Sequence, residues 1–173
     1  HLAPFTDYKA LAGEGDARII TKAEGVWLTD SEGKQLLDGM AGLWCVNVGY
    51  GHKRLADVAW KQMQELPYYN TFFKTAHPPV AELSQKLAQI TPKGLNHAFY
   101  GTSGSEANDT MVRLVKRYWN ILGKVEKKII IGRQYGYHGS TMAATSLGGF
   151  LGMHKMSDLP LPGFLHVDAP YQW

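Results

Sequence analysis

The sequence predicts an α/β protein that contains a mixed or parallel sheet. Three observations predict it: short strands joined by a turn near the N-terminus, apolar residues at helical spacing in the middle, and a strand–helix–strand alternation over residues 97–132. Strand, helix and strand in this order form a βαβ unit, whose two strands run parallel.

The N-terminal part favours antiparallel strands. Strands are expected at 18–21, 26–29 and 35–38, with Asp30-Ser31-Glu32-Gly33 as the turn before the last one. Residues before Arg18 are expected to be irregular. The glycine-rich stretch 39–52 surrounds Trp44 and predicts a close-packed loop that shapes a site.

The remaining elements follow from apolar periodicity and from glycine and proline breaks. Helices are expected at 52–65, from Pro79 to 90 and at 103–122, where Gly123 ends the longest one. A short buried strand is expected at 97–100 and further strands at 128–132 and 164–168, the rest of 148–173 being loop-like.

Composition excludes several classes of protein. The 173 residues are 45% hydrophobic and 19% charged, which suits a globular core, and the net charge of +3 is too small and scattered to indicate nucleic-acid binding. No apolar run is long enough to span a bilayer. Cys45 is the only cysteine, so no internal disulfide forms. We expect the Cys45 side chain to be buried. A single cysteine suits a reducing compartment, and we expect a cytoplasmic protein. The histidines lack metal-site spacing, and we expect no metal.

The run from Phe99 to Asp109 carries the clearest chemical signal. Small hydroxyl residues and glycine stand where a strand passes into a long helix, and a helix N-terminus favours an anion such as phosphate. Ser103, Gly104 and Ser105 are the candidate ligands. The alternative is an ordinary capped helix, since Ser103 and Glu106 fit a capping box. The run matches neither the Walker A nor the dinucleotide-binding pattern.

A second signal lies at residues 135–140. Tyr137 and His138 stand on a glycine-flanked loop, where an aromatic ring either packs the loop or stacks on a planar cofactor. Three further aromatic residues are expected in loops: Trp44, Phe72 and Phe73. Each could pack in the core, line an apolar pocket or lie at a subunit interface. Together the two signals predict a pocket for a small, planar, phosphorylated cofactor.

Several motifs in order give a family resemblance over residues 2–173. The chain resembles class III aminotransferases, pyridoxal-phosphate enzymes of fold type I, in residues 38–44, 49–52, 100–109 and 136–140. Leu43-Trp44 and residues 70–74 make it most similar to the amine:pyruvate (ω-) transaminases. The resemblance implies the N-terminal part of such an enzyme, with residues 1–50 in the small domain and 51–173 in the large cofactor-binding domain.

The resemblance also implies roles for particular residues. Ser103, Gly104 and Ser105 would bind the cofactor phosphate, Tyr137 would stack on its ring and His138 would support it. Phe5, Trp44, Phe72 and Phe73 would line the substrate pocket. The partners would be an amine, a keto acid and further copies of the chain, as a homodimer or a dimer of dimers that shares its active sites.

One departure from the family pattern concerns the catalytic lysine. The Schiff-base lysine that holds the cofactor is expected beyond Trp173, because Lys74, Lys93 and Lys155 lie in no matching context. The expected function is transamination from a primary amine, ω-amino acid or diamine to a keto acid such as pyruvate, and we expect these 173 residues alone to be inactive. An aminomutase or decarboxylase of the same fold and a non-catalytic module that binds a phosphorylated ligand remain the alternatives.

Overall fold

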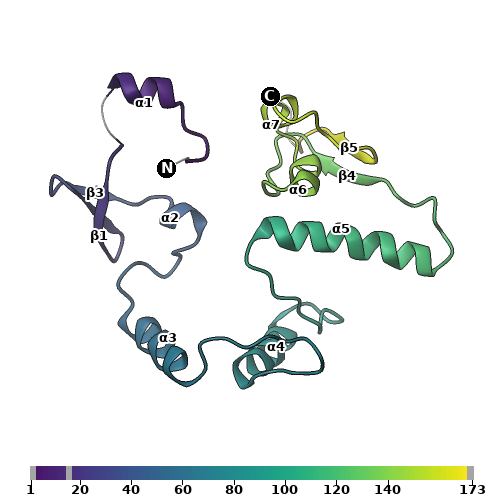
Figure 1. Ribbon diagram of the computed structural model, residues 1–173, viewed down its shortest axis with the longest axis horizontal. Coiled ribbons are helices and arrows are strands. Elements are labelled where there is room, and N and C mark those ends of the chain that lie inside the picture. The colour runs from purple at the N-terminus through teal and green to yellow at the C-terminus, as the bar shows by residue number, and fades with distance from the viewer. Residues whose placement is uncertain (1–2, 15–16, 171–173) are drawn as a thin grey trace. The chain divides into compact units, whose positions relative to one another are not determined.

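The computed structural model describes residues 3–14 and 17–170. The chain forms two compact units, one up to His77 and one from Pro78 onward (Figure 1). The expected division into domains at residues 50 and 51 stays a prediction.

The first unit is built around a three-stranded antiparallel sheet. Its elements are α1 (Tyr8–Glu14), β1 (Ile20–Glu24), β2 (Trp27–Asp30), β3 (Gln35–Leu37), α2 (Ala41–Trp44) and α3 (Lys53–Glu65). The sheet order is β1-β2-β3, and the register of the β2–β3 hairpin pairs Trp27 with Leu37. The predicted turn and hairpin are therefore confirmed.

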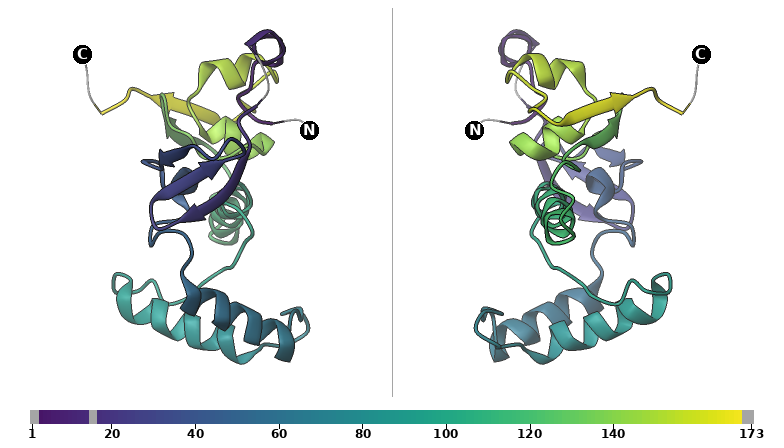
Figure 2. Two further views of the ribbon diagram at one scale, coloured as in Figure 1. Left: turned by 90° about the vertical axis from the view of Figure 1, so that its left-hand side faces the viewer. Right: turned by 90° about the vertical axis from the view of Figure 1, so that its right-hand side faces the viewer.

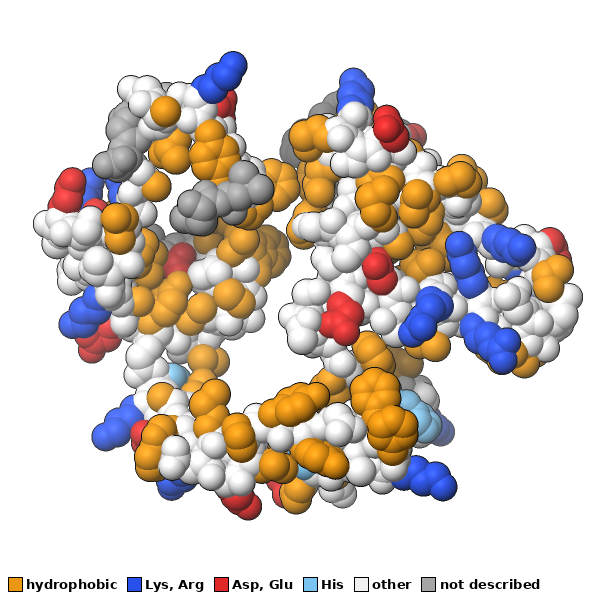
Figure 3. All heavy atoms as spheres, in the orientation of Figure 1, with side chains coloured by type: hydrophobic (Ala, Val, Ile, Leu, Met, Phe, Trp, Pro, Cys, Tyr) orange, Lys and Arg blue, Asp and Glu red, His pale blue; other side chains and the backbone are white. Residues whose placement is uncertain are grey.

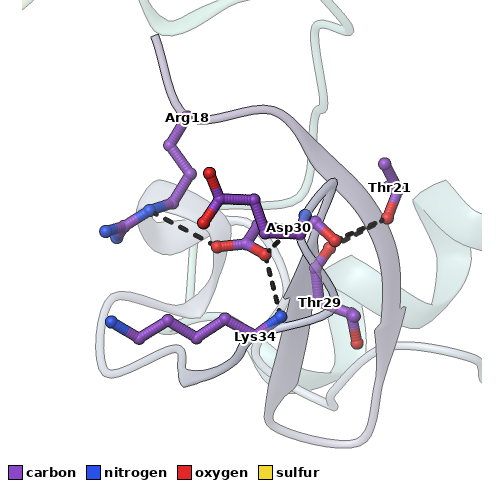
Figure 4. A network of polar contacts seen from close by, with 6 residues as sticks. Arg18, Thr21, Thr29, Asp30 and Lys34 are labelled. Carbon is purple, nitrogen blue, oxygen red and sulfur yellow. Dashed lines mark hydrogen bonds and ion pairs between the residues drawn. The ribbon is translucent and has the colours of Figure 1, made fainter. Parts of the chain in front are cut away.

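Asp30 fixes the turn of that hairpin. Its side chain is 5% exposed, and Oδ1 accepts hydrogen bonds from the backbone N–H groups of Glu32 (3.0 Å) and Lys34 (2.9 Å). Arg18 Nε lies 3.7 Å from Oδ2, and the hydroxyl of Thr21 donates to the carbonyl of Asp30 (Figure 4). A carboxylate that accepts from its own turn mimics a backbone turn, which explains why this short loop closes on a buried acid.

The second unit combines helices with a parallel strand pair. Its elements are α4 (Pro78–Ile90), α5 (Gly104–Ile121), β4 (Ile130–Arg133), α6 (Met142–Leu147), α7 (Leu151–Lys155) and β5 (Phe164–Val167). Strands β4 and β5 run parallel, with Ile130 opposite Phe164. Parallel strands need a long crossover, and α6 and α7 lie in the segment that supplies it (Figure 2).

Helix α6 forms the centre of this unit. It contacts α5 and both strands, and the buried core consists of Val112 from α5, Leu147 from α6 and Phe164 from β5. The partly buried Ile130, Ala143 and Leu161 extend this core. The packing joins the first turns of α5 to the strands through α6, and so determines where the loop between β4 and α6 lies.

Four predictions of secondary structure are wrong. The stretch 39–52, expected to be a close-packed loop, contains α2, and its residues Leu43, Trp44 and Val48 are exposed. Residues 97–100 form no strand, because no other strand of the described chain lies beside them; Phe99 is 61% exposed, and the Tyr100 hydroxyl lies 2.8 Å from that of Ser84 on α4. Helices α1 and α7 stand where irregular chain and loop were expected. Oδ1 of Asp7 caps α1 by accepting from the N–H groups of Lys9 and Ala10.

Cys45 is exposed, whereas burial was expected. Its thiol follows a tight turn and lies 2.9 Å from the carbonyl oxygen of Gly42. The apolar neighbours that suggested burial, among them Leu43 and Val48, are themselves exposed.

Gly132 in β4 provides a test of this packing. A Cβ at that position would overlap the backbone carbonyl of Leu147 at the end of α6. We therefore expect Gly132→Ala to lower the free energy of unfolding of the full-length protein by about 1–3 kcal/mol, measured by urea denaturation.

Gly152→Ala is the matched control, because a Cβ there meets nothing within 4 Å and the residue lies inside α7. It should leave stability unchanged or raise it by about 0.5–1 kcal/mol. Equal unfolding midpoints for the two variants would contradict the packing of α6 on β4.

Candidate cofactor site

Helix α5 begins after the N-cap residue Ser103, as the sequence predicted. Ser103 is the N-cap, and its hydroxyl accepts a hydrogen bond from the N–H of Glu106 (3.1 Å). The carboxylate of Glu106 accepts from the N–H (2.7 Å) and the hydroxyl (2.9 Å) of Thr102, rather than from the N–H of Ser103 as in a full capping box. These two bonds, the backbone one first, hold the pKa of Glu106 below its ordinary value.

The cap leaves two donors of this helix end unused. The backbone N–H groups of Gly104 and Ser105 donate to no acceptor in the part of the chain that the structure describes. Gly104 is exposed, with nothing within 4 Å of the place where a Cβ would stand. Unused N–H groups at the positive end of an 18-residue helix, with open space beside Gly104, are groups that favour an anion.

Side chains from the first turns of α5 hold the loop between β4 and α6. Oγ of Ser105 accepts from the N–H of Ser140 (2.9 Å), and the amide of Asn108 donates to the carbonyl of His138 (2.7 Å). Oδ1 of Asp109, the residue next to Asn108, accepts from the hydroxyl of Thr141 (2.7 Å). The loop is thereby fixed against the helix N-terminus.

This close approach requires a glycine. Gly139 is buried and has a φ of 134°, and a Cβ there would overlap the side chain and the Cα of Ser105. Only a residue without a side chain adopts this conformation readily and fits this space. The sequence motif contained Gly139 but did not show which residue it must face.

Tyr137 stands at the open edge of the same loop. Its hydroxyl lies 3.1 Å from that of Ser140, and its ring meets Phe150 at 6.3 Å between centroids with the planes 47° apart. The side chain is 53% exposed, so part of the ring remains open, while His138 is half-buried. A phenol ring placed near unused N–H donors suits a ligand that is both flat and anionic.

The five predicted cofactor residues therefore lie in one part of the second unit. Ser105, Ser140 and Tyr137 are linked by consecutive contacts, and Asn108 ties His138 to the helix. Sequence reasoning assigned no role to Asn108, Asp109 or Thr141. The available signal was a polar pair one turn into an amphipathic helix, together with a threonine that caps the next helix at Ala144.

The four predicted pocket residues all lie in the first unit. Phe5, Trp44, Phe72 and Phe73 are exposed by 84%, 82%, 69% and 91%. The rings of Phe72 and Phe73 meet at 6.0 Å between centroids. Phe5, Trp44 and Phe73 have positive φ values of 51°, 73° and 56°, a strained conformation for residues that carry a side chain. Such strain clusters at functional sites, which makes these three aromatics notable.

Neither a metal-binding cluster nor a membrane-spanning helix occurs among the described residues. They contain no group of three or more histidine, cysteine, aspartate or glutamate side chains arranged to hold a metal ion. Over the same ranges, no helix combines the length and the apolar character that crossing a membrane requires.

Comparison with known proteins gives a consistent result. The family model described as aminotransferase class-III matches residues 11–173. The chain is 58% identical over 171 residues to the putrescine–pyruvate aminotransferase of Pseudomonas aeruginosa, covering 99% of this chain and 37% of that protein. It is 39% identical to the diaminobutyrate–2-oxoglutarate transaminase of Halomonas elongata, covering 93% of this chain and 34% of the relative.

Solved structures show the same fold. The ω-transaminase of Pseudomonas jessenii, in complex with PMP, matches with a TM-score of 0.95 and 43% identity over 99% of this chain and 38% of that one. A transaminase from the marine bacterium Virgibacillus matches with a TM-score of 0.94 and 39% identity, over 98% and 38%. The chain thus spans little more than a third of the length of these relatives. It has the α/β fold of these transaminases over that part, and it belongs to the class III aminotransferases.

Proposed function

We propose that this protein is a pyridoxal-phosphate-dependent transaminase. It moves an amino group from a primary amine, an ω-amino acid or a diamine to a keto acid such as pyruvate. The observation that carries the proposal is the pair of unused N–H groups at Gly104 and Ser105, held beside the Tyr137 loop. The family and the relative named for putrescine and pyruvate support the reaction class.

The residues of the second unit fit this cofactor. Ser103, Gly104 and Ser105 would hold the phosphate, the open part of the Tyr137 ring would stack on the pyridine ring, and His138 would support it. Pyridoxal phosphate, when bound, supplies an electron sink for the carbon that loses its proton. The chain's own task here is to bind and orient that group through a rigid loop, which keeps the reacting centre at one place.

The aromatic residues of the first unit are proposed to line the amine pocket. Phe5, Trp44, Phe72 and Phe73 are uncharged, so they suit the apolar or neutral part of an amine. We further propose that the enzyme is a homodimer, or a dimer of dimers, whose subunits share these sites. Hydrophobic side chains cover much of the visible faces of the two units, an area open to contact with another copy or with further residues of the same polypeptide (Figure 3). On α3 alone, Leu55, Val58 and Met63 are all more than half exposed.

Four further expectations belong to this proposal. Residues 1–50 would form part of the small domain and 51–173 part of the large one. The covalent lysine would be none of Lys74, Lys93 and Lys155, whose side chains are exposed, and these 173 residues alone would not transaminate. We propose that the protein is located in the cytoplasm. A sequence with one cysteine suits that reducing compartment, because it needs no disulfide.

Removal of one hydroxyl tests the phosphate site. Ser105→Ala deletes the oxygen that accepts from Ser140 and that would face the phosphate. We expect the dissociation constant for pyridoxal phosphate to rise roughly tenfold or more, because bonds to charged groups are the stronger ones. The measurement is a spectroscopic titration of cofactor-free, full-length protein.

The control for that titration is Ser157→Ala, which replaces an exposed serine two residues after the end of α7. This variant should bind pyridoxal phosphate within about twofold of the unaltered protein, as surface substitutions usually do. An unchanged affinity in Ser105→Ala would contradict the assignment of the phosphate site.

Covalent trapping and turnover together test the function. Full-length protein is incubated with pyridoxal phosphate, reduced with borohydride and digested, and the modified peptide is identified by mass spectrometry. In parallel, alanine formation from putrescine and pyruvate is measured. We expect one modified lysine outside residues 1–173, and alanine formation that requires the cofactor.

Pyridoxine phosphate, which lacks the aldehyde, serves as the control and should give no adduct. Labelling spread over several surface lysines, with no alanine formed from any amine tested, would refute the proposed function.

A further inference from the structure

The turn that carries Trp44 is wound in an unusual direction. All four residues of α2 have positive φ values: 48° at Ala41, 61° at Gly42, 65° at Leu43 and 73° at Trp44. The N–H of Trp44 donates to the carbonyl of Met40 (2.8 Å), which closes one left-handed turn. Three of these residues carry a Cβ, for which this winding is unfavourable. Such a turn persists only where its surroundings hold it.

Asp38 holds the start of this turn. One carboxylate oxygen accepts from the N–H of Gly42 (2.7 Å) and the other from the N–H of Met40 (3.0 Å). The backbone of Asp38 is tied to the sheet, because its own N–H donates to the carbonyl of Val26 (2.9 Å). The carboxylate therefore connects the left-handed turn to the end of β3.

Tyr50 holds Asp38 from the other side. Its hydroxyl donates to Oδ2 of Asp38 (2.8 Å), the oxygen that also binds Gly42. Its backbone forms a two-bond bridge with Gly25, between β1 and β2, with distances of 2.8 and 3.1 Å. The Tyr50 hydroxyl, followed by the Gly42 N–H, lowers the pKa of Asp38, and the pKa of Tyr50 is raised in return. At neutral pH the pair is a carboxylate and a neutral phenol.

The turn also fits closely against Tyr50. A Cβ on Gly42 would meet the Tyr50 hydroxyl at 2.8 Å and the Val46 side chain at 2.7 Å, so there is no room for one. Trp44 itself is 82% exposed, and little in this unit packs around its indole. The turn therefore sets the direction in which the Trp44 side chain leaves the backbone, and Asp38 and Tyr50 hold the turn.

We propose that Asp38 and Tyr50 are positioning residues that fix the left-handed turn, set the direction from which Trp44 meets the amine, and so set the selectivity between short and bulky amines. This inference rests on the proposed function, in which Trp44 lines the amine pocket. Neither Asp38 nor Tyr50 touches the substrate in this account. Both act through the turn.

The first measurement is selectivity in full-length Tyr50→Phe. The ratio of kcat/KM for putrescine to kcat/KM for 1-phenylethylamine should fall by roughly threefold to tenfold. This is the factor expected when the turn loses one hydrogen bond. Tyr118→Phe is the matched control, since Tyr118 lies on α5 and its exposed hydroxyl forms no hydrogen bond among the described residues. It should leave the ratio unchanged.

A double mutant separates positioning from general structural damage. In a Trp44→Ala background, Tyr50→Phe should have no further effect on the ratio, because two residues that act through one another are not additive. An equal effect of Tyr50→Phe with and without the indole would overturn the proposal. Asp38→Asn, which keeps one acceptor oxygen, gives a second test in case Tyr50→Phe fails to fold.

A readout without turnover keeps this inference distinct from the proposed function. In protein labelled with 5-fluorotryptophan, Tyr50→Phe should shift or broaden the ¹⁹F resonance of Trp44, assigned with Trp44→Phe, and leave that of Trp119 unchanged. If the unaltered protein turns over no amine, the proposed function fails, while the resonance still reports on the turn. An unaltered Trp44 resonance in both Tyr50→Phe and Asp38→Asn would overturn the proposal.

Discussion

The hydrogen bonds between the first turns of α5 and the loop before α6 are the constraint on which the candidate site depends. Ser105, Asn108 and Asp109 bind Ser140, His138 and Thr141, residues about 30 positions away along the chain. The cap at Ser103 satisfies one N–H of the helix and leaves those of Gly104 and Ser105 without an acceptor in the described part of the chain. A helix end free for an anion and a loop that carries an aromatic ring are thus parts of one rigid arrangement, which is the requirement for orienting a flat phosphorylated group.

In the first unit, side-chain hydrogen bonds likewise hold a backbone segment in place, here a left-handed turn. Its sheet is small, and the chain after β3 takes a left-handed turn that unaided backbone would avoid. One carboxylate, Asp38, bonds to two backbone N–H groups of this turn and to one phenol fixed on the sheet. In both units, hydrogen bonds from polar side chains fix the backbone segments that carry the candidate binding residues.

Some of this was predictable from local sequence. The hairpin turn at Asp30 and the start of α5 at Ser103 have short-range signals, a turn-forming acid and a capping serine, and the structure has both. The strand expected at residues 97–100 is absent because a strand depends on a partner that local sequence does not reveal. The bonds of Asn108 and Asp109, and the winding at residues 41–44, depend on distant residues for the same reason. The identity of the cofactor came from family resemblance, not from periodicity or spacing.

The central claim, that the N-terminus of α5 binds the cofactor phosphate, is tested most directly by amide hydrogen exchange. Exchange over residues 101–107 of the full-length, cofactor-free protein is compared after addition of pyridoxal phosphate and after addition of pyridoxal, which lacks the phosphate. The account predicts slower exchange at Gly104 and Ser105 with pyridoxal phosphate and little change with pyridoxal. Equal protection by both compounds, or none by either, would contradict it.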